Sequence, residues 1–258
     1  MLTNQTTEKL LAMKLNGMVD ALEKQADTPE LGSLSFDDRF GLLVDAEYTN
    51  RENTRFGSRL KTANLRLSAC FEDIDVESKR GLDRTVIAAL STCKWVDEAI
   101  NIAIDGKTGT GKTYLACALA HKACRSGYSS MYFRTSRFFE GLVVSRLNNR
   151  YSQFLEKLAK VDVLVVDDFA LAPLTEEQAR DLLEVVDDRF GKRPLIIASQ
   201  LPPDNWYGAI PTATMADAIL DRIINGSQKL HLTGPSRRKN KTNTDSADSP
   251  MDTDKKKK

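Results

Sequence analysis

The chain has 258 residues, 41% of them hydrophobic, which is enough to bury the core of one large domain or of two unequal ones. Lys and Arg (37) balance Asp and Glu (36), so the net charge of +1 excludes nucleic-acid binding driven by the overall charge. No apolar run approaches the roughly 20 residues that span a bilayer, and the first residues lack a signal-peptide pattern. The four cysteines and two histidines show no metal-binding spacing. We expect a cytoplasmic protein that does not contact a membrane.

Residues 1–68 are expected to form a small all-helical domain. Apolar residues recur at helical spacing over 11–22, and the segment 29–33 interrupts the pattern. Ser35 followed by Asp38 predicts the start of a second helix. That helix either continues to Leu67 or breaks and restarts before it.

Basic residues gather toward the end of this helical part, and Glu52 is the only acid among them. The pattern indicates either a solvated helix face or contact with DNA phosphates. The scarcity of acids favours DNA. The predicted DNA-binding residues are Arg51, Arg55, Arg59, Lys61 and Arg66.

Residues 69–239 alternate apolar runs with helical patterns, which is typical of a parallel α/β sheet flanked by helices. Residues 81–83 form a plausible helix start. The expected strands are 100–105, 130–134, 161–166, 194–199 and 228–232. Residues 240–258 contain no Leu, Ile, Val or aromatic residue and are expected to be disordered.

Residues 106–113 read Gly-Lys-Thr-Gly-Thr-Gly-Lys-Thr, the spacing of a phosphate-binding loop (Walker A). The glycines allow backbone N–H groups to turn toward a phosphate, and Lys112 can reach the β- and γ-phosphates. The Thr113 hydroxyl suits Mg²⁺. An apolar strand before the loop and helix formers after it argue against a chance match. The predicted nucleotide-binding residues are Gly106, Lys107, Thr108, Gly109, Thr110, Gly111, Lys112, Thr113 and Tyr114.

The strand 161–166 leads into Asp167 and Asp168, the arrangement of a Walker B element. Asp167 is predicted to hold Mg²⁺ through its water shell, and Asp168 to polarise the attacking water. The alternative is a strand that ends in a polar turn. Gln200 follows the strand 194–199 and could bridge the γ-phosphate and the water.

Phosphoryl transfer also needs positive charge at the γ-phosphate beyond the loop lysine. Arg222 and Arg238 are the candidates, with ordinary surface arginines as the alternative.

These motifs together resemble the IstB-like helper ATPases of insertion sequences, which are AAA+ proteins near the initiator DnaA and the helicase loader DnaC. The resemblance covers about residues 8–239. It rests on Gly-Lys-Thr-Tyr-Leu-Ala, Asp-Asp-Phe-Ala-Leu-Ala-Pro-Leu, Leu-Asp-Arg and Gly-Pro-Ser-Arg-Arg, and on the flanking Leu-Asn-Gly-Met and Leu-Leu-Val-Asp-Ala-Glu.

The resemblance implies an AAA+ P-loop fold, ATP and Mg²⁺ as cofactors, and ATP hydrolysis. It implies a homo-oligomer on duplex DNA that assists a partner transposase in target selection. By motif position, Gln200 corresponds to sensor 1, Arg222 to an arginine finger acting in trans, and Arg238 to sensor 2. With Lys112, Asp167 and Asp168, these are the expected catalytic residues.

The chain departs from the family pattern at Lys107, where proline is usual, at Ala170, where glycine is usual, and at Pro235, where glutamate is common. Asp168 replaces the glutamate of many AAA+ proteins. None of these changes removes a catalytic group, but they leave the hydrolysis rate open. A DnaC-like helicase loader would share the whole ATPase core, and a monomeric kinase would share the loop without needing a trans arginine.

Overall fold

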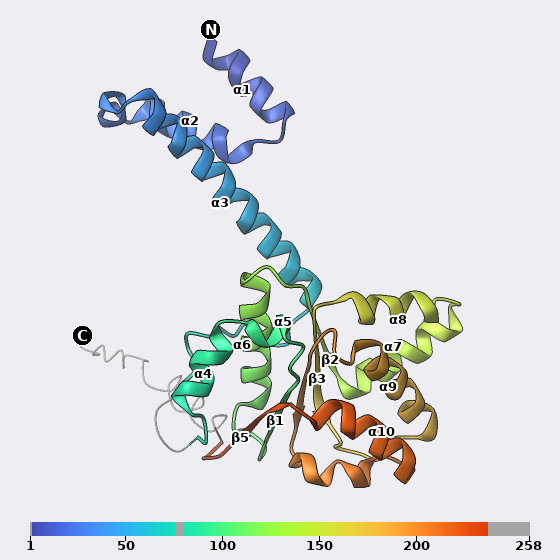
Figure 1. Ribbon diagram of the computed structural model, residues 1–258. Helices are drawn as coiled ribbons and strands as arrows, with labels where there is room; N and C mark the ends of the chain where they lie inside the picture. The colour runs from blue at the N-terminus through green and yellow to red at the C-terminus, as the bar shows by residue number, and fades with distance from the viewer. Residues whose placement is uncertain (1, 76–79, 237–258) are drawn as a thin grey trace, which may run out of the picture. The chain divides into compact units, whose positions relative to one another are not determined.

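The computed structural model describes residues 2–75 and 80–236 and divides into two units, one ending at Lys61 and the other beginning at Thr62 (Figure 1). The boundary expected from the sequence lay after residue 68. Residues 62–68 belong to the second unit, where Ala63 is fully buried. Arg238 and the segment 240–258 lie outside the described residues, so the predictions made for them stay predictions.

The described part of the first unit is helical, as predicted. It contains α1 (Leu2–Ala12), α2 (Asn16–Asp27), the short 3₁₀ helix η1 (Pro29–Ser33) and α3 (Phe36–Ala63). The Ser35 hydroxyl accepts the Asp38 N–H at 3.1 Å, which confirms the predicted helix start. α3 then runs without a break and ends before Leu67.

Close packing of α2 on α3 depends on Gly17. A Cβ at this position would lie 2.7 Å from the Ala46 carbonyl oxygen, so a larger residue would push the helices apart. The buried Glu47 carboxylate accepts the N–H groups of Gly17 (2.8 Å) and Met18 (3.3 Å). Arg51 Nε donates to the same carboxylate at 2.7 Å. Glu47 therefore satisfies amides that the first turn of α2 leaves unpaired.

Within the described residues, the second unit is built on a parallel sheet of five strands in the order β2-β3-β4-β1-β5. All five expected strands are confirmed, two with the expected bounds and three with shifted ends. They are β1 (Ile102–Gly106), β2 (Ser130–Arg134), β3 (Val163–Phe169), β4 (Leu195–Ser199) and β5 (Gln228–Leu232). β1, β3 and β4 are apolar along almost their whole length because helices cover both faces.

Each face of the sheet has its own apolar core (Figure 1). One face packs on α4 (Arg84–Ser91), α5 (Lys94–Asp97) and α6 (Lys112–Arg125). The other packs on α7 (Thr135–Leu147), α8 (Tyr151–Lys160), α9 (Glu176–Arg189) and α10 (Ala213–Ile224). Two 3₁₀ turns, η2 (Pro203–Asn205) and η3 (Tyr207–Ala209), precede α10.

Local signals set the ends of several helices. Asp83 caps α4 by accepting the Thr85 N–H at 2.7 Å, at the helix start that the sequence predicts. Gly127 follows α6 with φ of 103°. Cys117 and Cys124 are buried in α6. No helix among the described residues is long and apolar enough to cross a membrane.

Because all five strands are parallel, their carboxyl ends share one edge of the sheet. The loop after β1, the end of β3 and the residues after β4 therefore lie together. In open α/β sheets this edge is where ligands bind.

Candidate nucleotide-binding site

The loop of residues 106–113 joins β1 to α6, in the strand–loop–helix context that the sequence predicts. Gly109 and Gly111 have φ of 87° and 106°, values that favour glycine. A Cβ on Gly109 would lie 2.2 Å from the Ser236 hydroxyl oxygen, so this position has no room for a side chain. The loop ends at the N-terminus of α6, where amides without helical partners favour an anion.

The Lys112 side chain is buried beneath this loop. Its Nζ donates to the carbonyl oxygens of Gly106 at 2.6 Å and Lys107 at 2.9 Å. The Thr110 hydroxyl also donates to the Lys107 carbonyl, at 2.8 Å. These contacts fix the positively charged Lys112 ammonium group at the base of the loop.

A cavity of about 570 Å³ opens beside the loop, within the usual range for small-molecule sites. It is lined by Arg66, Leu67, Thr108, Gly109, Gly111, Lys112, Thr113, Tyr114, Asp168 and Gln200. Most of the predicted nucleotide-binding residues are thus brought together. Gly106, Lys107 and Thr110 belong to the loop but do not line the cavity. Leu67 and Tyr114 supply apolar surface at one side of it.

The two Walker B carboxylates sit on an irregular end of β3. The pairing of β3 with β4 shifts between Val166 and Phe169, and Asp168 has φ of 61°. Phe169 fixes this bend, since it is buried against Trp206 and its carbonyl accepts the Ser199 hydroxyl at 2.7 Å. Ala170 follows with φ of 57°. Alanine adopts this left-handed conformation at a cost of about 1 kcal/mol, whereas glycine would adopt it without that cost.

Asp167 is only 1% exposed, and both of its carboxylate oxygens are hydrogen-bonded. Oδ2 accepts the Thr113 hydroxyl at 2.8 Å and the Tyr132 hydroxyl at 2.6 Å, and Oδ1 accepts the Asp168 N–H at 2.9 Å. Asp168 is about one-third exposed and faces the cavity. The two adjacent carboxylates therefore have different environments: Asp167 is buried and accepts three hydrogen bonds, whereas Asp168 faces the cavity.

Tyr132 was not predicted as a site residue. It lies on β2 and is 7% exposed, and its pKa is raised above the ordinary value by burial and by the hydrogen bond to Asp167. It therefore stays a hydroxyl donor. The sequence holds one weak signal for this role, a phenol inside an apolar strand, since buried phenols need a partner.

Arg66 is also found in an unexpected place. The sequence predicts it as a DNA-binding residue, but the structure places it at the cavity beside the loop of residues 106–113, beyond the end of α3. Its Nη1 lies 3.7 Å from Asp168 Oδ2 and 4.0 Å from Asp167 Oδ2. No sequence motif connects Arg66 to the carboxylates, so only the fold shows this contact.

Gln200 lies at the same edge, as predicted for a residue that follows β4. Its Oε1 accepts the Thr108 hydroxyl at 2.7 Å. The amide thus contacts the phosphate loop directly and lines the cavity.

The donor set at this edge fits Mg²⁺. Thr113 Oγ1 and Asp167 Oδ2 lie 2.8 Å apart, so one cation could contact both oxygens. No group of three or more His, Cys, Asp or Glu suited to a metal occurs among the described residues. Mg²⁺ uses one or two protein oxygens and takes its other ligands from water and phosphate.

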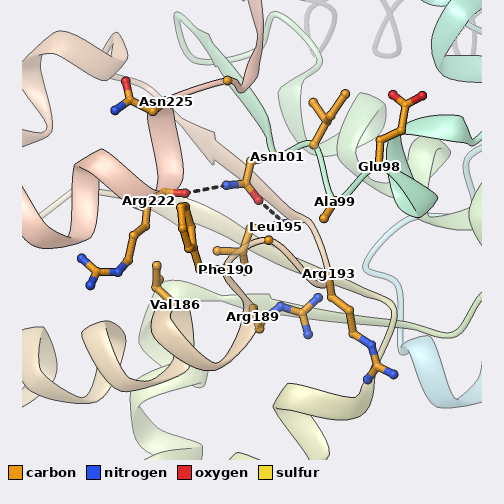
Figure 2. Close-up of a pocket in the computed structure, with 13 residues that line it drawn as sticks. Glu98, Ala99, Asn101, Val186, Arg189, Phe190, Arg193, Leu195, Arg222 and Asn225 are labelled. Carbon is orange, nitrogen blue, oxygen red and sulfur yellow. Dashed lines mark hydrogen bonds between the residues drawn. The ribbon is translucent and has the colours of Figure 1, made fainter.

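Arg222 lies near the end of α10, close to the amino ends of the strands rather than their carboxyl ends. It lies beside a cavity of about 230 Å³ (Figure 2). Asn101 Nδ2 donates to the Arg222 and Ile223 carbonyls at 2.9 and 3.1 Å, and its Oδ1 accepts the Leu195 N–H at 2.8 Å. Figure 2 shows the Arg222 guanidinium pointing away from Asn101. The guanidinium pairs with Asp187 and donates to the Ala218 carbonyl at 2.7 Å.

The remaining predicted DNA-binding residues all lie on α3, in the first unit. Arg51 and Arg55 each pair with an acid of the same helix, Glu47 and Glu52. Both arginines keep at least half of their side-chain surface exposed. Arg59 and Lys61 follow them along α3. This helix face is therefore less purely basic than the number of basic residues in the sequence indicates.

Comparison with known proteins decides which family this site belongs to. The model of the family described as "IstB-like ATP binding protein" matches residues 8–245. The chain is a member of that family. A putative insertion sequence ATP-binding protein of Sinorhizobium fredii is 42% identical over 93% of this chain and 98% of its own length. An insertion sequence IS1162 putative ATP-binding protein of Pseudomonas fluorescens is 46% identical over 78% and 88%.

The fold agrees with this assignment to the IstB-like family. The crystal structure of the DnaC helicase loader superposes with a TM-score of 0.54, over 64% of this chain and 97% of that one. At 16% identity, this similarity shows a common AAA+ fold and no more. The IstB-like family name adds ATP binding, and the site described above is built for it.

Proposed function

We propose that this IstB-like protein is a Mg²⁺-dependent ATPase that assembles in many copies on duplex DNA and assists a partner transposase in choosing a target. Family membership and the phosphate cavity support ATP binding. The assembly is supported by one further observation, the position of Arg222.

Arg222 lies near the opposite end of β1 from the loop of its own subunit, and it does not line the cavity there. Arg222 lies just before β5, and the first residue of β5 pairs with the first residue of β1. The loop of residues 106–113 begins at the other end of β1. The strand between these edges spans four residue steps, which is about 13 Å. An arginine needed at a γ-phosphate must therefore reach the cavity of a neighbouring copy. A complete catalytic site then needs two protomers.

The residues of the cavity have distinct tasks in this proposal. Loop amides and Lys112 bind the phosphates, and Thr113 with Asp167 holds the cation. Bound Mg²⁺ would supply charge neutralisation at the phosphate oxygens. Asp168 is the carboxylate open to the cavity, so it is the group that can accept a proton from an attacking water. Gln200 is placed to orient that water.

Duplex DNA is the proposed ligand of the α3 arginines. The side chains of Arg51 and Arg55 are at least half exposed, and Arg59 is partly exposed. The contact would be with phosphates, so it would weaken steeply with salt. The Arg55→Gln/Arg59→Gln double variant should lower the slope of log affinity against log salt by ~2, one unit per lost phosphate contact. The double variant Arg137→Gln/Arg180→Gln is the charge-matched control, since these exposed arginines lie in the second unit. An unchanged slope in the α3 variant would remove these residues from the DNA contact.

Assembly is tested by imaging the protein on duplex DNA with a non-hydrolysable ATP analogue. Wild type should form rings or helices, and Lys112→Ala should form none. If Lys112→Ala assembles as well as wild type, the proposal is wrong. Co-purification with a replicative helicase, together with no affinity for duplex DNA, would instead support a helicase loader.

The trans role of Arg222 has its own test. Arg222→Ala should keep nucleotide binding and lose hydrolysis by ~10³-fold or more. Mixing Lys112→Ala with Arg222→Ala should restore part of the activity, because one variant supplies the cavity and the other the arginine. No restoration, with both variants folded, would contradict a shared site. Turnover per subunit that does not depend on protein concentration would favour a monomeric kinase-like enzyme.

A further inference from the structure

Asp167 Oδ2 has three hydrogen-bond donors or positive groups around it, but a carboxylate oxygen accepts only about two hydrogen bonds. An ionised oxygen offers about two lone-pair positions. The hydroxyls of Thr113 and Tyr132 fill both, at 2.8 and 2.6 Å. Arg66 Nη1 approaches the same oxygen at 4.0 Å and sits closer to Asp168 Oδ2, at 3.7 Å. Arg66 is thus the outermost of the three donors and holds both carboxylates by charge.

This arrangement makes Arg66 the counter-charge of two adjacent carboxylates. Asp167 is almost completely buried and Asp168 is one-third exposed, so the pair of negative charges is partly shielded from water. Among the described residues, Arg66 is the basic side chain within ion-pair distance of both carboxylates. A divalent cation at Thr113 and Asp167 would approach the same oxygen, and two cations repel each other in this partly dry site.

The Arg66 backbone lies on a short segment between two buried anchors. Ala63, the last residue of α3, is fully buried, and Ala69 is 2% exposed. Asn64 takes a left-handed φ of 49° directly after α3. A change at the Arg66 side chain therefore acts on a segment only three residues from the end of α3.

Resting on the proposed function, we propose that Arg66 is the internal counter-cation of the Asp167–Asp168 pair, and that a divalent cation must displace it to bind there. Arg66 then sets how much Mg²⁺ is needed for tight nucleotide binding. When Arg66 is released, the segment 64–67 becomes more mobile. Nucleotide binding in the cavity therefore changes the residues directly after α3.

The test is a Mg²⁺ titration of fluorescent ATP-analogue binding to the full-length protein without DNA. Arg66→Gln should lower the half-saturating Mg²⁺ concentration about three- to fivefold, the upper part of the range for loss of one partly exposed ion pair. Arg66→Lys keeps the charge and should stay within about twofold of wild type. Arg180→Gln removes a charge from exposed α9 and should change nothing. An equal or higher Mg²⁺ requirement in Arg66→Gln would overturn the proposal.

Hydrogen exchange of wild type provides a second measurement that needs no variant. Amides of residues 64–67 should exchange faster when Mg²⁺ and the nucleotide analogue are added together than with the nucleotide analogue alone. Unchanged or slower exchange there would overturn the release of this segment. Both measurements are independent of DNA assembly. If the protein binds nucleotide but never assembles, the proposed function is refuted. The role of Arg66 in Mg²⁺ binding could still be measured in that case.

Discussion

The hydrogen bond between Tyr132 and Asp167 allows a quantitative prediction, because the chain contains a matched pair elsewhere. Tyr132→Phe removes only the hydroxyl that donates to the buried Asp167 Oδ2 at 2.6 Å. Tyr128 donates to Asp97 Oδ1 at 2.8 Å in an exposed position. Tyr128→Phe therefore deletes the same chemical contact where water can replace it.

A hydrogen bond to a charged group is worth about 1.5–3 kcal/mol when the acceptor cannot turn to water. Asp167 keeps its bond from Thr113, so we expect Tyr132→Phe to lower the free energy of unfolding by about 2 kcal/mol. For a domain of this size that corresponds to a fall of roughly 4–8 °C in Tm. Tyr128→Phe should lower the free energy of unfolding by less than about 0.5 kcal/mol, the range for surface substitutions.

The assay is thermal unfolding of the full chain without nucleotide or magnesium, so that Asp167 has only protein partners. Urea unfolding provides the free energies. If Tyr132→Phe melts within about 1 °C of wild type, or if both variants lose the same stability, the buried bond is not what holds Asp167. Loss of metal-dependent nucleotide affinity in Tyr132→Phe alone would link the bond to the site.

Three further predictions concern other parts of the structure. Gly109→Ala should weaken nucleotide binding at least tenfold in a direct binding assay, because the new Cβ would collide with Ser236; unchanged affinity would show that the loop can move aside. Asn101→Ala should cost about 2–4 kcal/mol in urea unfolding, since it leaves two carbonyls at the end of α10 and one amide of β4 without their bonds. The pKa of Glu47 is lowered from 4.5 by the Arg51 hydrogen bond and by the amides at the start of α2. A lowered pKa means that ionised Glu47 stabilises the folded state above pH 4.5, and this stabilisation is lost as the pH falls below 4.5. Glu47→Gln cannot lose it, so its helical content, measured by circular dichroism, should decline less between pH 5 and 3 than that of the wild type.

Much of the fold could be predicted from sequence because its signals are local. The five strands are short apolar runs with helical patterns between them, and period and composition are sufficient to find them. The phosphate loop is a contiguous motif, so its residues and its position between a strand and a helix follow from the order of residues along the chain. Asp167 and Asp168 are predictable for the same reason, since a buried strand leads directly into both.

The position of Arg66 shows where such reasoning ends. By spacing it belongs with the basic residues of α3, but the helix ends at Ala63 and the chain then turns toward the sheet. Nothing in the sequence marks the left-handed turn at Asn64 strongly. If the end of α3 is predicted a few residues too late, Arg66 is assigned to the wrong unit.

The sequence by itself determined the parallel sheet, the phosphate loop and the carboxylate pair, because each is written in residues adjacent along the chain. The tertiary structure alone decided which distant groups surround them. Tyr132 meets Asp167 across 35 positions, and Asn101 meets the Arg222 carbonyl across 121. Such contacts depend on strand order and on the bulge at the end of β3, which are set by packing of the whole core and leave no periodic trace in the chain.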